Sequence, residues 1–186
     1  EAAAGANALA ASTTLSGYVS TSWLSLDGVA TTYYADALSL DRFTLDVVDL
    51  KFASAQGAGE YATGYTVEIW AGGNHALDTA NSGSAGTVEV YQANIDLRLP
   101  VGNGLDVKIG QFTTNVGAET SNYNENAFYT RSHGFAVEPT HHTGILASYQ
   151  LTDDAGISVG FVNDTTTNAV NADSGGTAFL VTLNYT

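Results

Sequence analysis

The segment YQANIDLRLPVGNGLDVKI, residues 91–109, carries the strongest fold signal in the chain. Before Pro100 apolar and polar residues alternate, and after Gly104 the same alternation resumes. A period of two residues is that of a β-strand, and the Pro and Gly residues between the two stretches favour a tight turn. The segment therefore predicts a β-hairpin with one polar and one apolar face. On its first strand the apolar face carries Tyr91, Ala93, Ile95, Leu97 and Leu99.

Charge pairing indicates the register of this hairpin. If Leu99 lies opposite Leu105, two pairs of opposite charge meet across the strands: Arg98 with Asp106, and Asp96 with Lys108. Cross-strand ion pairs stabilise a sheet, and both pairs arise from this one register.

Two further local features are predicted from the same pattern. In the later hairpin, residues 143–163, the alternation pairs Leu151 with Ile157. In the strand 43–55 the apolar phase changes midway, which indicates a β-bulge near Val48.

Extended along the whole chain, the alternation predicts an all-β, antiparallel, up-and-down fold of eight strands: 15–26, 43–55, 61–72, 87–99, 105–113, 143–151, 157–163 and 177–186. The connections alternate between long and short. The long ones are 27–42, 73–86, 114–142 and 164–176. In an up-and-down sheet all of these lie at one end, as do the extracellular loops of outer-membrane barrels. Residues 1–14 are interpreted as a flexible tail or the remnant of a secretory signal.

Composition excludes several classes of protein. The chain has 186 residues with Lys+Arg 5 against Asp+Glu 19, a formal net charge of −14, so we expect no nucleic-acid partner. It has no cysteine, which rules out disulfides, thiolate metal sites and cysteine nucleophiles. No apolar run reaches the roughly 18–20 residues of a membrane helix, but that test does not detect membrane-spanning β-strands, because their residues alternate.

Two architectures fit strands with one apolar and one polar face. In a soluble sandwich the apolar faces meet each other, whereas in a membrane barrel the apolar face meets lipid and the polar face lines the lumen. The regular alternation of loop lengths favours the barrel. In that case the predicted pore-lining residues are Asp46, Asp49, Lys51, Glu68, Asp96, Arg98, Asp106 and Lys108.

Four short motifs lie at strand ends and in the long connection: Gly110-Gln111-Phe112, Gly117-Ala118-Glu119, Tyr129-Thr130-Arg131-Ser132 and His142-Thr143-Gly144. With the runs around them, over about 105–164, they resemble the family named Putative beta-barrel porin-2, whose members are bacterial outer-membrane porins. Ala118 stands where that family usually has an aromatic residue. The likeness extends less specifically over most of 15–186.

The resemblance implies a function and a location. It implies a transmembrane β-barrel in the bacterial outer membrane, surrounded by lipid, that forms a water-filled channel for passive diffusion of small hydrophilic solutes or ions, without a cofactor. Members of the family are generally longer, so the eight strands are expected to be part of a larger barrel. Trimers are common among porins, which makes a homo-oligomer a candidate assembly.

The charged residues suggest selectivity and a constriction. Among the predicted pore-lining residues five acidic side chains face three basic ones, which predicts a mild cation preference. Structureless loops as long as 114–142 are usually functional, and porins can fold an early loop into the lumen. Its charged residues Glu119, Glu125 and Arg131 are therefore candidate constriction residues. The alternative is that this loop only caps the barrel or contacts a neighbour.

Nothing in the sequence predicts an enzyme. No elbow motif frames a serine nucleophile, so no catalytic residue is assigned. The adjacent His141 and His142 would point to opposite faces of a strand, which makes a poor chelate, so no metal site is assigned either. The alternative function is that of a non-conducting envelope or secreted β-sheet protein, such as an adhesin, a scaffold or a surface-layer component.

Overall fold

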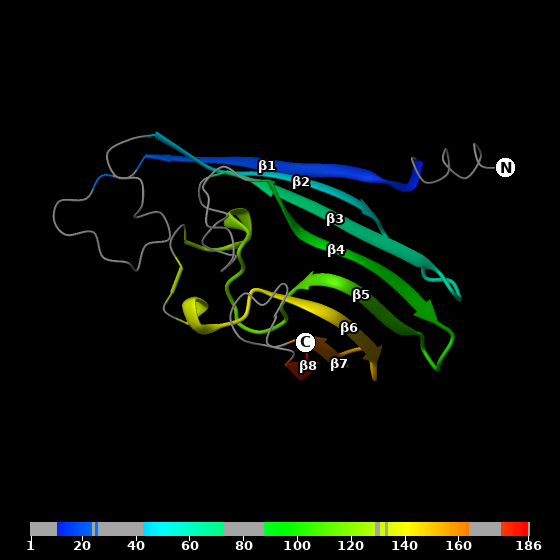
Figure 1. The fold of residues 1–186 in the computed structure, drawn as a ribbon. Helices are drawn as coiled ribbons and strands as arrows, with labels where there is room; N and C mark the ends of the chain where they lie inside the picture. The colour runs from blue at the N-terminus through cyan, green and yellow to red at the C-terminus, as the bar shows by residue number, and fades with distance from the viewer. Residues whose placement is uncertain are drawn as a thin grey trace.

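The computed structural model describes residues 11–23, 25, 43–72, 88–128, 131–132, 134–163 and 176–185. They form one eight-stranded antiparallel sheet in which each strand pairs with the next along the chain (Figure 1). The strands are β1 (Thr14–Trp23), β2 (Phe43–Ser54), β3 (Thr63–Ala71), β4 (Val88–Leu99), β5 (Leu105–Thr113), β6 (His141–Gln150), β7 (Ala155–Asn163) and β8 (Thr177–Tyr185). The predicted up-and-down, all-β fold is confirmed.

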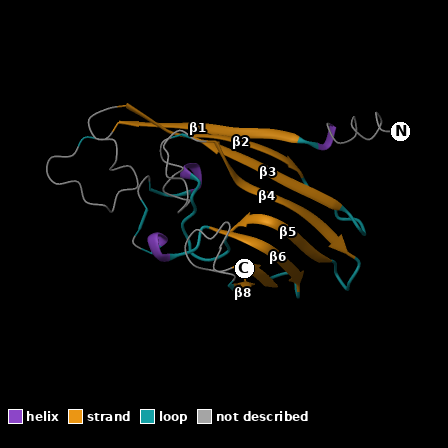
Figure 2. Cartoon of the chain, in the orientation of Figure 1, coloured by secondary structure: helices purple, strands orange, loops and turns teal. Residues whose placement is uncertain are grey.

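The helical pieces of the described chain are short and lie outside the strands, before β1 at residues 11–12 and in the β5–β6 connection (Figure 2). Two single 3-10 turns, η2 (Tyr123–Glu125) and η3 (Phe135–Val137), lie between β5 and β6. None of the helices among the described residues has the length and apolar character needed to cross a membrane. The predicted loops 27–42 and 73–86, residues 164–175 of the fourth loop and residues 1–10 of the predicted tail lie outside the described residues.

The two faces of the sheet differ in chemistry. On the outer face, large apolar side chains stand exposed along seven of the eight described strands, whereas on β3 the outer side chain of Ile69 is half-buried. The exposed examples are Val19, Leu50, Ile95, Ile109, Ile145, Val159 and Val181. The opposite, inner face carries the charged side chains and is the face against which the long β5–β6 connection packs. An exposed apolar face and a covered polar face reverse the arrangement of a soluble sandwich.

The hairpin of β4 and β5 has the predicted register. Leu99 pairs with Leu105, and the pairs Arg98 with Asp106 and Asp96 with Lys108 follow from it.

The hairpin of β6 and β7 differs from the prediction by two residues. Ile157 pairs with Tyr149 rather than with Leu151. The cause is a tighter turn, because the backbone N–H groups of Leu151 and Thr152 both donate to the carbonyl of Ala155, at 2.8 and 3.0 Å. A shift of two residues keeps every side chain on its predicted face, since the strand repeats every two residues.

Two β-bulges turn additional side chains inward. In β2 the extra residue is Asp46, two positions before the predicted bulge at Val48, and both Asp46 and Val47 are buried. In β4 the extra residue is Tyr91. The prediction that Tyr91 belongs to the outer apolar face is therefore wrong, because the bulge shifts the phase and buries its ring on the inner face.

Two apolar clusters occupy the inner face near the ends of the strands that lead into the long connections. The first consists of Val47, Trp70 and Tyr91, with Tyr18 and Tyr123 packed against it. In it the Trp70 and Tyr91 rings stack at 3.8 Å between centroids. The second consists of Phe112, Leu146 and Val162, with Ala178 and Leu180 packed against it.

The sheet is open in the part of the chain that the structure describes, with β1 and β8 as its edges. It curves strongly from one edge to the other (Figure 1). An open, curved, up-and-down sheet of this kind is consistent with part of a barrel wall.

Candidate functional site

The charged side chains of the inner face are joined in three ion pairs. Lys51 Nζ lies 3.3 Å from Glu68 Oε2, Arg98 Nη1 lies 3.0 Å from Asp106 Oδ1, and Lys108 Nζ lies 3.1 Å from Asp96 Oδ1. Each pair joins neighbouring strands, because the register places the partners directly opposite one another. Six of the eight residues predicted from sequence to line a pore thus lie on one face and form pairs.

Neutral polar side chains extend this network along β4. Lys108 also donates to Asn94 Oδ1 at 3.2 Å, and the Asn94 amide donates to Gln92 Oε1 at 3.4 Å. The Gln92 amide in turn donates to Glu68 Oε2 at 2.6 Å. A continuous polar line therefore connects the ion pairs of β2–β3 and β4–β5.

The two remaining predicted residues, Asp46 and Asp49, are buried on the same face. The Asp46 carboxylate accepts hydrogen bonds from the hydroxyls of Ser20 at 3.1 Å and Ser22 at 2.7 Å. Asp49 is 6% exposed, and its Oδ1 has no hydrogen-bond partner among the described residues. The bulge at Asp46 brings these two carboxylates to one face although they are three positions apart.

The long connection, residues 114–140, is closed at its base. The backbone N–H of Thr114 donates to the carbonyl of Thr140 at 3.0 Å, and the Thr114 hydroxyl lies 2.9 Å from His142 Nε2. His141 meets the Tyr91 ring edge-on at 4.4 Å between centroids. His142 lies beside Phe112 of the second cluster, at 6.1 Å between ring centroids, so the two histidines hold the start of β6 against both apolar clusters. The connection therefore leaves and re-enters the sheet at neighbouring points.

From this base the connection crosses the inner face to β1. The Tyr18 hydroxyl accepts a hydrogen bond from the backbone N–H of Tyr123 at 3.2 Å and lies 3.5 Å from Asn122 Oδ1. Tyr123 packs against the Val47–Trp70–Tyr91 cluster. A segment that follows β5 thus contacts the first strand, 105 residues earlier in the chain.

The candidate constriction residues stabilise the connection itself. Glu119 accepts hydrogen bonds from the backbone N–H of Ser132 at 3.1 Å and from the Ser132 hydroxyl. Glu125 accepts from the Asn122 amide at 3.0 Å. Arg131 donates to the carbonyl of Ser121 at 2.8 Å and lies over the rings of Tyr123 and Phe135.

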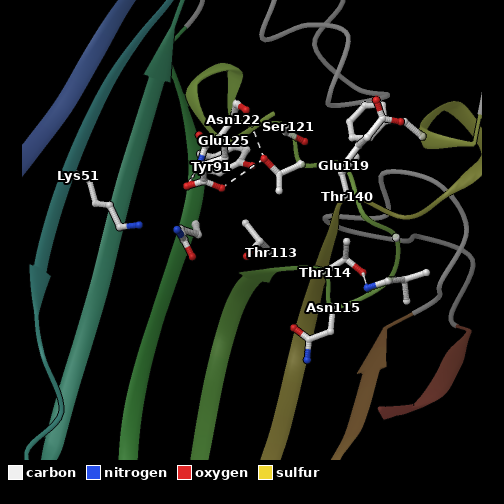
Figure 3. A pocket seen from close by; sticks show the side chains of 15 residues that line it. Lys51, Tyr91, Thr113, Thr114, Asn115, Glu119, Ser121, Asn122, Glu125 and Thr140 are labelled. Atoms are coloured by element: carbon white, nitrogen blue, oxygen red, sulfur yellow. Dashed lines mark hydrogen bonds between the residues drawn. The ribbon is translucent and has the colours of Figure 1, made fainter. Parts of the chain in front are cut away.

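A cavity of about 190 Å³ lies between the connection and the sheet (Figure 3). Lys51 and Gln92 line it from the sheet, while Glu119, Asn122 and Glu125 line it from the connection. In Figure 3 the Lys51 side chain extends from β2 toward the space opposite Glu125. The cavity brings one predicted wall residue and two predicted loop residues to the same space, whereas Arg131 is absent from its lining.

Tyr18, Trp70 and Tyr123 anchor the long connection on the inner face, but they were not among the site residues predicted from the sequence. A signal for Tyr18 exists, because it lies in phase with Ser16, Ser20 and Ser22 on the polar side of its strand. An aromatic ring among polar residues indicates an inner-face packing partner. Within the described ranges, no group of three or more His, Asp or Glu side chains could hold a metal ion.

An antiparallel up-and-down sheet with an exposed apolar face and ion-paired charges on its covered face has the pattern of a β-barrel wall. The comparisons with known proteins agree. The family model described as "Putative beta-barrel porin-2, OmpL-like" matches residues 10–186, and the chain belongs to this family. No curated protein and no solved structure matches it.

Proposed function

We propose that the chain contributes to the wall of a bacterial outer-membrane porin, a water-filled channel for passive diffusion of small hydrophilic solutes. The contrast between the two faces of the sheet is the observation that supports this function most strongly. Apolar side chains such as Ile95 and Val181 stand exposed where lipid would cover them, while charged pairs lie on the enclosed side. An eight-stranded barrel has an interior filled by side chains, so the proposed channel includes further strands.

The proposed channel is constricted by the connection 114–140. Its hydrogen bonds to Tyr18 and its packing on the Trp70 cluster hold it across the inner face. A loop held in this way narrows the lumen and presents Glu119 and Glu125 to passing solutes.

The charge balance supports a preference for cations. In the described part of the inner face three basic side chains, each in an ion pair, stand against five carboxylates, which include the buried Asp46 and Asp49. Carboxylates along a pore attract cations and repel anions. Because the excess is small and partly buried, we expect a mild rather than a strict preference.

This function is tested by reconstituting the full-length natural protein in planar bilayers under a KCl gradient. The expected reversal potential has the sign of K⁺ preference over Cl⁻, and it shifts toward zero in the double variant Asp46→Asn with Asp49→Asn. A reversal potential of the opposite sign contradicts the selectivity. Absence of conductance from folded protein contradicts the pore.

One observation favours a second candidate, a non-conducting envelope protein. Near the long connection the inner face is packed by the Trp70–Tyr91 stack and by Tyr123, and the cavity between the connection and the sheet measures about 190 Å³. Such a protein would keep a heat-modifiable, membrane-inserted fold but would pass no current.

A further inference from the structure

We propose that the inner wall holds a specific binding site for one monovalent cation at the Asp49 carboxylate, where β1, β2 and β3 lie side by side. The site rests on the proposed function only for the route by which an ion arrives. Its occupancy is independent of whether the channel conducts.

The first observation is the state of the Asp49 side chain. It is 6% exposed, yet its Oδ1 has no hydrogen-bond partner in the described structure. Buried carboxylate oxygens are nearly always satisfied, because removing a charge from water without compensation is costly. An unpartnered oxygen at this depth points to a ligand.

The second observation is the local charge balance. Among the described residues, the charged side chains that act on Asp49 are Glu68, which is acidic, and Lys51, which is basic. The Lys51 ammonium lies 3.3 Å from Glu68 Oε2, so its charge is already engaged. Two carboxylates and one ammonium leave one negative charge, and one positive charge balances it.

The neighbours of Glu68 reinforce this arrangement. Besides Lys51, Glu68 accepts hydrogen bonds from the Gln92 amide at 2.6 Å and from the Trp70 indole N–H at 3.2 Å. These donors contact both Glu68 oxygens and hold the carboxylate in place beside Asp49. The second carboxylate therefore strengthens the negative potential at Asp49 Oδ1.

The uncompensated charge matches a singly charged ion. Ca²⁺ sites use several carboxylate oxygens among six to eight ligands, which is more negative charge than the one left over beside Asp49. Na⁺, K⁺ or an ammonium group requires less charge.

An ion can reach the site from the cavity beneath the long connection. Lys51, Gln92 and Asn122 line this cavity, and Gln92 bonds directly to Glu68 behind it. Asn122 also lies 3.5 Å from the Tyr18 hydroxyl, and Tyr18 pairs with Asp49 across β1 and β2. The cation would pass these side chains and exchange its water for the carboxylates.

The experiment measures sodium NMR linewidths as NaCl is titrated into the refolded full chain in detergent micelles, at constant ionic strength. The comparison is between wild type, Asp49→Asn and the matched variant Asp106→Asn, which removes the same charge from an ion pair elsewhere on the inner face. We expect a saturable broadening in wild type and in Asp106→Asn. In Asp49→Asn the sodium affinity should fall at least about tenfold.

Equal broadening in wild type and Asp49→Asn overturns the proposal, as does broadening that never saturates in wild type. Heat-modifiable gel migration verifies folding, and Asp49→Ser is the second variant if Asp49→Asn fails to fold. Competition by K⁺ but not by methylammonium identifies an alkali-metal site, and the reverse identifies an ammonium site. If the sodium line broadens saturably but the full-length protein shows no conductance, the result contradicts the porin function and supports the cation site.

Discussion

Replacing Val181 with arginine is expected to lower the free energy of unfolding in lipid by about 2–4 kcal/mol. Val181 is 67% exposed, points to the outer face and lies at the centre of β8. In the proposed membrane location its surroundings are hydrocarbon, where a guanidinium has no partner. Equilibrium unfolding in urea with phospholipid vesicles measures the change.

The adjacent Thr182 provides the matched control, because it points to the inner face of the same strand. Thr182→Arg places the same charge where we propose water, so its expected cost is less than half that of Val181→Arg. If both variants lose the same stability, or if Val181→Arg loses none, the outer face does not meet lipid.

Truncating Trp70 to alanine is expected to cost about 3–5 kcal/mol of stability. Trp70 is 2% exposed, stacks on Tyr91 and donates its indole N–H to Glu68. The change leaves a cavity and removes a hydrogen bond to a buried carboxylate. Because Tyr123 packs on this cluster, we also expect the long connection to loosen and current noise to rise.

Trp23→Ala is the control for this variant, because Trp23 is the other tryptophan of the chain. It is 54% exposed and lies beside Phe43. Its loss should destabilise the protein by clearly less than the loss of Trp70. The same unfolding titration ranks the two variants. A larger cost at Trp23 than at Trp70 means that the inner cluster is not an organising core.

The sequence predicted the strands and one register because those features depend on local patterns. Alternation follows from the period of a strand, and the hairpin of β4 and β5 has two charge pairs that only one register satisfies. The hairpin of β6 and β7 has no such charges, and its register depended on the turn. There the prediction was wrong by two residues, because the hydrogen bonds to the Ala155 carbonyl shorten the turn.

The change of phase in β2 indicated a bulge within two positions of its place, but the bulge in β4 and the path of the long connection were not predictable from alternation. A bulge adds one residue and exchanges the faces, so Tyr91 was placed on the wrong side although its strand was correct. The contact between Tyr18 and Tyr123 depends on two segments 105 residues apart that are brought together only after the sheet has formed. No local sequence pattern predicts a contact between residues so far apart in the chain.

The central claim is that the inner face lines a water-filled lumen and the outer face contacts lipid. Cysteine accessibility along β5 tests this claim most directly. The chain has no cysteine, so single-cysteine variants are unambiguous. In bilayers, a charged thiol reagent should react with Asp106→Cys and Lys108→Cys and reduce the current, while Val107→Cys and Ile109→Cys remain unmodified. Equal reaction at all four positions, or faster reaction at positions 107 and 109, would contradict this account.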